Sequence, residues 1–249
     1  MGNMMKINSV IITFNPNENV LRLIDDLKLQ GVTPIIVDNS SKDFDFKEIE
    51  TDSDCYFLKL SDNLGIAEAQ NRGIEKAIEL GAEKILFFDQ DSIITNNFVE
   101  EMISDYKLLS SQNNKIGALG PRFIDQRGNF YYKMISISDK GLRFKFDVSN
   151  INAPFHSKLL ISSGSLIDVE TIRTVGLMRA DYFIDYVDTE WCIRAEEKGF
   201  KNYVSARAIM YHTIGDDINK NKFFTMPIHS PFRRYYIIRN TIYMFNEPH

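Results

Sequence analysis

Little in this 249-residue sequence ties it to a membrane, an oxidising compartment or nucleic acid. Its two cysteines, Cys55 and Cys192, lie far apart and lack the spacing of a metal site, which indicates free thiols in a reducing compartment, the cytoplasm. No stretch approaches the roughly 20 apolar residues of a transmembrane helix, and residues 1–6 are too polar to begin a secretory signal. Acidic residues outnumber basic ones by 34 to 29, which disfavours a nucleic-acid partner.

The composition is that of a globular protein with a sizeable core, since 44% of the residues are hydrophobic and 25% are charged. No internal repeat, low-complexity tract or Gly/Ser linker divides the chain. We therefore expect one domain over residues 1–249, built from two intimate halves.

Strand-like and helix-like patterns alternate over the first 110 residues. Short apolar runs at 9–14, 34–37, 56–60 and 84–88 predict strands, and apolar residues at helical spacing predict helices at 18–30, 66–80 and 95–109. The strands are continuously apolar, which indicates an α/β sheet covered on both faces. The second half is less regular: we expect strands at 116–119 and 159–161, helices at 168–175, 189–198 and 231–245, and loosely defined strands and loop at 129–147.

Polar residues follow three of the predicted strands, at 13–15, 38–40 and 89–91. Ligands of open α/β sheets bind beyond the carboxyl ends of the strands, so these segments are candidates for a binding site. An aspartate at a strand end is more often a turn former or helix cap. Asp89 and Asp91 form an Asp-x-Asp pair, which either binds a hard divalent cation or caps the helix that starts at 95–97.

Six motifs in this order resemble the family 2 inverting glycosyltransferases of the GT-A fold, and among them the bacterial rhamnosyltransferases. They are VIITFN (10–15), VDNSS (37–41), NLGIAEAQNRG (63–73), FFDQDS (87–92), SSGSLI (162–167) and FIDYVDTEWCIR (183–194). The resemblance runs from about Ser9 to Thr213. It implies a Rossmann-like mixed sheet flanked by helices, with a nucleotide-binding half at about 7–110 and an acceptor-binding half with a C-terminal helix at about 111–249.

The resemblance assigns the sugar nucleotide to polar residues at strand ends and around the start of the helix near residue 65. Asp38 matches the family residue that accepts a hydrogen bond from the pyrimidine imide, which selects uracil or thymine over cytosine. The implied donor-binding residues are Thr13, Asn15, Asp38, Asn63, Gly65, Asn71, Arg72, Asp89, Gly164 and Ser165. Two structural alternatives stay open: Asn71 and Arg72 on a helix face packed against the sheet, and residues 162–165 as a tight turn only.

The resemblance also implies a cofactor, Mg²⁺ or Mn²⁺. Asp91 matches the direct metal ligand, Asp89 lies beside the ribose and the metal, and His212 matches a further metal ligand of some family members. A lone histidine after an apolar run is otherwise a structural residue.

Inverting transfer is a single in-line displacement, so it needs a base on the face opposite the leaving diphosphate. Alignment of Glu190, Trp191 and Arg194 with the family motif implies that Asp188 is this base. Alternatively, Asp188 caps the following helix, with Trp191 and Cys192 facing the core. The family often has an acidic residue just before the base, where this chain has Val187. Asp185 is the substitute or the alternative base.

We therefore expect a transferase that moves L-rhamnose from dTDP-L-rhamnose to a polysaccharide or lipid-linked glycan. The alternatives are a UDP-sugar transferase of the same fold and a catalytically inactive sugar-nucleotide or glycan-binding module. A sugar-nucleotide pyrophosphorylase is disfavoured, because residues 13–17 lack the basic, glycine-rich phosphate loop that it needs.

The C-terminal segment is locally basic, although the whole chain has a net charge of −5. Residues 218–246 contain five basic residues and no acidic one, with aromatic residues between them. Either a terminal helix packs on the core with solvated arginines, or Arg233, Arg234 and Arg239 bind an anionic partner. That partner is a lipid-diphosphate acceptor or the inner face of the cell membrane, contacted peripherally.

Overall fold

The structure is a computed structural model that describes residues 5–125, 128, 130–138, 142–212, 218–221, 224–227 and 230–246. Its centre is a mixed sheet, which has nine strands among these residues, in the order β3-β2-β1-β4-β10-β6-β11-β5 with β9 attached to β11. Four strands of the first half pair in parallel: β1 (Ile7–Thr13), β2 (Thr33–Asp38), β3 (Tyr56–Lys59) and β4 (Lys84–Asp89). The expected α/β fold with a mixed sheet is confirmed.

The second half of the chain continues the same sheet. β10 (Leu166–Asp168) lies antiparallel between β4 and β6 (Ile116–Asp125), and β6 pairs in parallel with β11 (Lys201–His212). The short strands β5 (Ile93–Ile94) and β9 (Phe155–His156) pair with β11. One continuous sheet therefore joins the two halves.

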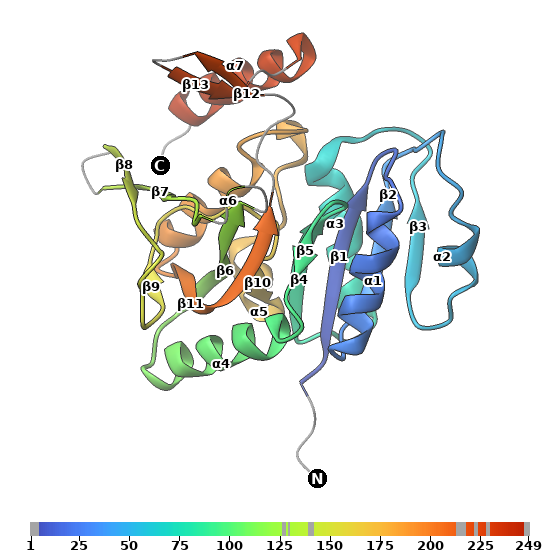
Figure 1. Ribbon diagram of the computed structural model, residues 1–249, viewed down its shortest axis with the longest axis horizontal. Coiled ribbons are helices and arrows are strands. Elements are labelled where there is room, and N and C mark those ends of the chain that lie inside the picture. The colour runs from blue at the N-terminus through green and yellow to red at the C-terminus, as the bar shows by residue number, and fades with distance from the viewer. Residues whose placement is uncertain are drawn as a thin grey trace.

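Helices cover both faces of the sheet (Figure 1). They are α1 (Asn19–Leu29), α2 (Lys47–Thr51), α3 (Gly65–Glu79), α4 (Phe98–Ser111), α5 (Val169–Val175) and α6 (Val187–Glu197), with a 3-10 turn, η1 (Ala180–Tyr182). All seven residues of β1 are buried, as the continuous apolar pattern predicts for a sheet covered on both faces.

Two hairpins and one helix complete the described chain. β7 (Met134–Ile137) pairs with β8 (Arg143–Phe146), and β12 (Ile218–Asn221) pairs with β13 (Phe224–Pro227). Helix α7 (Pro231–Asn246) lies at the top in Figure 1, at the edge of the sheet to which the carboxyl end of β1 points. No helix of the described ranges combines the length and the hydropathy of a membrane span.

One predicted strand is wrong. Residues 159–161 are not a strand; the strand is β10, which follows the turn at 162–165. Leu166 and Ile167 pair with β4 and are 0% and 2% exposed, whereas Ile161 is 40% exposed. Placing the later apolar pair in the sheet therefore buries more apolar surface. Short elements such as α2, β5 and β9 were not predicted, and neither was the long strand β11.

Candidate active site

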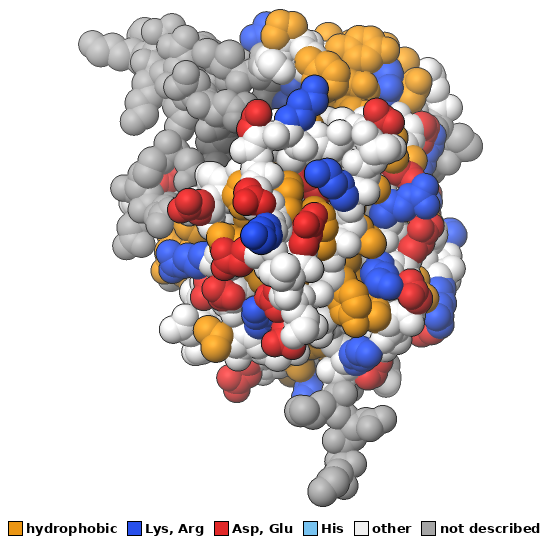
Figure 2. Space-filling model, turned by 90° about the vertical axis from the view of Figure 1, so that its right-hand side faces the viewer, with side chains coloured by type: hydrophobic (Ala, Val, Ile, Leu, Met, Phe, Trp, Pro, Cys, Tyr) orange, Lys and Arg blue, Asp and Glu red, His pale blue; other side chains and the backbone are white. Residues whose placement is uncertain are grey.

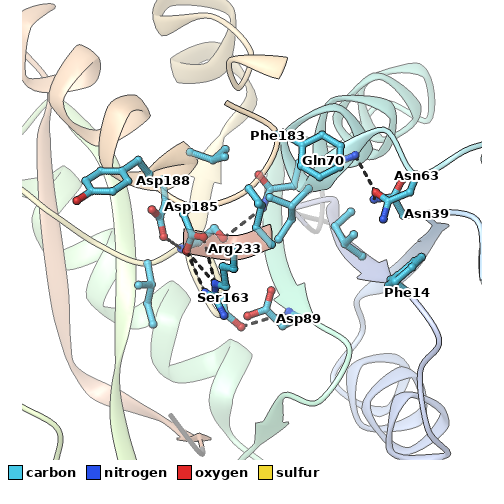
Figure 3. A pocket seen from close by; sticks show the side chains of 18 of the residues that line it. Phe14, Asn39, Asn63, Gln70, Asp89, Ser163, Phe183, Asp185, Asp188 and Arg233 are labelled. Atoms are coloured by element: carbon cyan, nitrogen blue, oxygen red, sulfur yellow. Dashed lines mark hydrogen bonds and ion pairs between the residues drawn. The ribbon is translucent and has the colours of Figure 1, made fainter. Parts of the chain in front are cut away.

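A cavity of about 790 Å³ lies at the carboxyl ends of the parallel strands (Figure 3). Its polar and charged lining comes from six separate segments of the chain. These side chains belong to Asn39, Asn63, Gln70, Asp89, Gln90, Ser162, Ser163, Asp185, Tyr186, Asp188 and Arg233. The structure therefore brings the ends of β2 and β4 together with the start of α6 and with α7.

Two asparagines form one wall of this cavity. Asn39 follows β2, and its side-chain amide donates to Asn63 Oδ1 at 2.9 Å, while its own Oδ1 accepts the backbone N–H of Leu64 at 2.8 Å. Asn63 Oδ1 also accepts the N–H of Gly65 at 3.0 Å. These bonds fix the entry into α3, so the predicted residue Asn63 organises the loop that faces the cavity.

Gly65 sits where no side chain fits. Its φ is +85°, and a Cβ atom there would lie 2.6 Å from both the ring and the carbonyl oxygen of Phe183. That carbonyl accepts the N–H of Ile66 at 2.7 Å. The close approach at this glycine is thus made to the loop before α6.

Asp89 ends β4, and its carboxyl group faces the cavity near Ser163 (Figure 3). Burial, together with the negative charges of Asp91 and Asp188, raises the pKa of Asp89 to about 6. Asp91 follows in the same turn and is exposed. The charges of Asp91 and Asp188 thus disfavour the charged form of Asp89, and a divalent cation is favourable in such an environment.

The described side chains contain no cluster of three His, Cys, Asp or Glu residues poised around a metal. His212 ends β11, and its side chain lies outside the described residues. The pair Asp89 and Asp91 still suits Mg²⁺, which usually keeps several waters and is held by one or two carboxylates plus substrate phosphates.

Asp188 lies in the first turn of α6, and the N-cap position is Tyr186. The interpretation of Asp188 as the helix cap is therefore wrong. Its carboxylate accepts the backbone N–H of Thr189 at 2.7 Å and that of Ser162 at 3.3 Å. Burial raises the pKa of Asp188, which makes it a stronger base than an exposed aspartate. Trp191 is buried beneath it, as predicted.

Asp185 is held by an arginine of the C-terminal helix. Arg233 Nε lies 3.1 Å from both carboxylate oxygens of Asp185, and its Nη2 lies 3.0 Å from Oδ1 (Figure 3). Both oxygens of Asp185 therefore face a guanidinium group, whereas those of Asp188 accept backbone N–H groups. Arg233 is the one Lys or Arg among the described residues that line the cavity.

Three predicted donor-binding residues lie beside the cavity. Thr13 and Asp38, at the ends of β1 and β2, are fully buried, and Thr13 Oγ1 donates to Asp38 Oδ1 at 3.1 Å. Ser41 donates its N–H to Asp38 Oδ2 at 2.9 Å. Asn15 is exposed, and its Oδ1 accepts the N–H of Lys42 at 2.9 Å. These bonds order the loops after β1 and β2 under the cavity edge.

The structure does not bring Asn71 or Arg72 to the cavity. Asn71 is buried, and its amide exchanges two hydrogen bonds with the backbone of Met178, at 2.8 and 2.9 Å. Arg72 lies on the outer face of α3 and pairs with Glu68 at 2.8 Å and Glu75 at 3.4 Å. The packing alternative therefore fits the buried Asn71, but it is wrong for Arg72, which is exposed.

Gly164 and Ser165 form the turn before β10. Gly164 has φ +77°, and a Cβ atom there would lie 2.6 Å from Pro121. Ser165 Oγ donates to the carbonyl of Ser162 at 2.6 Å. The cavity is lined instead by the two serines before them, Ser162 and Ser163.

The C-terminal arginines differ from one another. Arg239 donates to the carbonyl of Tyr182 at 3.0 Å and so belongs to the docking of α7 on the body. Arg234 is exposed. Figure 2 shows apolar side chains gathered at the top of the molecule, the level of α7 in Figure 1. The large apolar residues of α7 that are more than one third exposed are Phe232, Tyr235, Ile238, Ile242, Tyr243 and Phe245.

The residue assignments missed several members of the site, among them Asn39 and Gln70. Asn39 directly follows Asp38, in the strand-end segment 38–40 that was a candidate for the binding site. Gln70 lies inside α3 and is 3% exposed; its Nε2 donates to Ser162 Oγ at 3.2 Å, and its Oε1 has no partner among the described residues. Nothing in the helical pattern distinguishes it from a core-facing residue.

Comparison with known proteins gives a consistent result. The model of glycosyl transferase family 2 matches residues 9–176. The chain is 42% identical over 243 residues to the dTDP-rhamnosyl transferase RfbF of Shigella flexneri, covering 97% of this chain and 80% of that protein.

Solved structures with the same fold have low sequence identity to this chain. GalNAc-T7 with UDP, GalNAc and Mn²⁺ aligns with a TM-score of 0.67 and 15% identity, over 85% of this chain and 44% of that one. TarS 1-349 of S. aureus in complex with UDP aligns with a TM-score of 0.60 and 15% identity, over 85% and 61%. The chain thus spans less than half the length of the GalNAc-T7 chain.

Proposed function

Because this chain belongs to glycosyl transferase family 2 and is a glycosyltransferase, we propose that it transfers L-rhamnose from dTDP-L-rhamnose to a glycan acceptor. The observation that carries the choice of donor is the 42% identity, over nearly the whole chain, to a dTDP-rhamnosyl transferase. The cavity supports it, since carboxylates and polar side chains converge at the carboxyl ends of the parallel strands.

The proposed reaction is one in-line displacement that inverts the anomeric carbon. Asp188 removes the proton from the acceptor hydroxyl as its oxygen attacks, and the bond from the anomeric carbon to the diphosphate breaks. The backbone N–H groups of Ser162 and Thr189 hold the Asp188 carboxylate in place for this step. General-base catalysis of this kind contributes roughly 10²–10⁴-fold. No covalent sugar–enzyme intermediate is needed.

Asp91 and Asp89 would hold a divalent cation, and His212 remains the proposed further ligand. Bound Mg²⁺ or Mn²⁺ would neutralise charge on the departing dTDP. The negative charges of Asp91 and Asp188, which raise the pKa of the buried Asp89, support a cation there. GalNAc-T7, which shares the fold, contains Mn²⁺ in its structure.

For the donor, we propose that Asp38 selects the thymine ring and that Arg233 binds the diphosphate. The lining of the cavity carries Asp89, Asp185 and Asp188, while the donor itself is a dianion. Arg233 is the described cation that offsets this charge next to the site. The unpaired Oε1 of Gln70 is available to a donor hydroxyl, because a buried acceptor without a partner is costly.

The acceptor is proposed to enter past α7 and Asp185. A second cavity of about 460 Å³ shares Ile161, Asp185 and Tyr186 with the first, and its wall contains apolar residues such as Met134 and Leu159. A glycan linked to a lipid diphosphate fits such a mixed surface. Peripheral contact with an anionic membrane through Arg234 and the exposed apolar face of α7 remains part of this proposal.

Release of dTDP or UDP from purified sugar nucleotides tests the function. We expect metal-dependent release from dTDP-L-rhamnose, faster than from UDP-glucose, and stimulation by a lipid-linked glycan. Faster release from UDP-glucose would replace the rhamnosyl assignment by the UDP-sugar alternative. Binding of dTDP-L-rhamnose without any turnover would favour the inactive binding module.

A further inference from the structure

The loop before α6, residues 181–186, has an unusual backbone. Phe183, Asp185 and Tyr186 have φ values of 62°, 63° and 65°, although none of them is glycine. Phe183 also has ψ −67°, and the N–H of Ile184 donates to the carbonyl of Tyr182 at 2.7 Å, which together make a rare, strained form of γ-turn. Such a backbone persists only where surrounding contacts determine it.

Asn240 supplies those contacts. Its Nδ2 lies 2.9 Å from the carbonyl oxygen of Tyr182, and 2.8 Å from each of those of Ile184 and Asp185. Its Oδ1 accepts Nε and Nη2 of Arg239 at 3.0 and 2.8 Å, which fixes the orientation of the amide. One side-chain amide therefore gathers three carbonyl groups that the tight turn forces together.

Asn240 is fully buried, and it is the one buried residue of α7. A helix that buries a polar side chain and leaves its large apolar residues exposed is docked by hydrogen bonds more than by apolar packing. Two other contacts of α7 reach the same loop. They are the ion pair of Arg233 with Asp185 and the stacking of Tyr236 on Phe183, with ring centroids 4.7 Å apart.

The held loop leads directly into the site. Tyr186 is the N-cap of α6, and Asp188 follows two residues later in its first turn. On its other side the loop packs on the start of α3, where Phe183 accepts the N–H of Ile66. A shift of the loop would therefore move Asp188 relative to the donor-facing wall of the cavity.

We propose that Asn240 is a positioning residue for the transfer reaction. It holds the strained loop 181–186 so that Asp188 faces the donor in the geometry needed for proton removal. The inference rests on the proposed function, because it takes Asp188 as the base. The match to the family model ends at residue 176, before both the loop and α7 begin.

The test compares Asn240→Ala with Thr241→Ala in the full chain. Thr241 is the matched control, because its Oγ1 donates only within α7, to the carbonyl of Ile237 at 2.7 Å. We measure dTDP affinity with Mn²⁺, the kcat and KM of dTDP release from dTDP-L-rhamnose, and hydrogen exchange of a peptide that covers 181–190. The assays run well below the melting temperature of each variant.

In Asn240→Ala we expect kcat to fall by about 10²-fold, because a misplacement near 1 Å has that effect on an aligned reaction. dTDP affinity and KM stay within about threefold of the wild type, and exchange rises in 181–190 only. Thr241→Ala leaves all of these unchanged. Wild-type kcat in Asn240→Ala overturns the proposal, and so does a loss of dTDP affinity equal to the loss of kcat.

If Asn240→Ala does not fold, Arg239→Gln is the second variant that tests the proposal. It removes the hydrogen bonds that orient the Asn240 amide, and we expect a smaller fall of kcat with the same local rise in exchange. No change in either quantity overturns the proposal. If wild-type protein binds dTDP but releases nothing from dTDP-L-rhamnose, the proposed donor is wrong. The exchange comparison then still decides whether Asn240 holds the loop.

Discussion

Replacing Gly65 by alanine tests how closely the start of α3 and the loop before α6 must fit. The new Cβ atom would lie 2.6 Å from the carbonyl oxygen of Phe183 and 2.6 Å from its ring, at a residue with φ +85°. Gly81 is a matched control, because it has φ +77° and a methyl group added there would meet nothing within 4 Å. Both substitutions carry the backbone cost, and only Gly65→Ala carries the collision.

The backbone term is about 1–2 kcal/mol for an L-residue in the left-handed region. Alanine also lowers the conformational entropy of the unfolded chain, which offsets about 0.4–1 kcal/mol of this backbone cost. We therefore expect Gly81→Ala to lower the free energy of unfolding by about 1 kcal/mol. Overpacking against backbone adds about 1–3 kcal/mol, so Gly65→Ala should lower it by about 2–4 kcal/mol.

Urea unfolding of both variants gives the comparison, provided that the slope with denaturant is unchanged. Activity gives a second measurement, because the collision pushes Phe183 and the loop that leads to Asp188. We expect Gly65→Ala to lose dTDP release even where it is fully folded, and Gly81→Ala to keep it. Unfolding free energies of the two variants within about 0.5 kcal/mol of each other would refute the predicted collision.

Other substitutions test single roles in the site. Asp188→Asn should bind dTDP normally and lose transfer by about 10²-fold or more, as expected for a general base. Since burial raises the pKa of Asp188, wild-type kcat/KM should fall on acidification at a pH above the usual range of an aspartate; a profile that stays flat until the protein unfolds contradicts this. Asp91→Ala should abolish Mn²⁺-dependent dTDP binding and leave the melting temperature unchanged, because the side chain is exposed; retained binding would remove Asp91 from the ligands. Arg233→Gln should weaken dTDP binding about tenfold or more, the effect of a charged hydrogen bond, and Arg234→Gln should not; equal effects would place the diphosphate elsewhere.

The sequence predicted the nucleotide-binding half of the sheet well, because its signals are local. Continuous apolar runs gave β1, β2, β3 and β4, and periodic apolar residues gave α1, α3 and α4. Carboxyl ends of parallel strands meet at one edge, so the strand-end rule placed Asp89 and the loop after β2 at the cavity. The motif order then indicated the family, which the comparisons confirm.

The second half was predicted less well, because its strands depend on partners far away in the chain. Residues 159–161 are as apolar as a strand, yet β4 pairs with Leu166 and Ile167 instead. Asn71 belongs to a family motif, but its amide is taken by Met178, 107 residues later. A local pattern does not show which of two similar segments pairs with a distant strand, or whether a side chain bonds to a distant backbone group.

The sequence by itself therefore determined the fold class, the family and the carboxylates at the strand ends, since periodicity and motif order depend on neighbouring residues. Only the tertiary structure decided which residues surround the site with them. In the folded chain, Gln70 of helix α3 lines the cavity. Arg233 pairs with Asp185, 48 residues earlier, and Asn240 bonds to a loop 55 to 58 residues earlier. These contacts form because packing α7 and α3 against one loop brings distant hydrogen-bonding groups together, and no spacing in the chain encodes that.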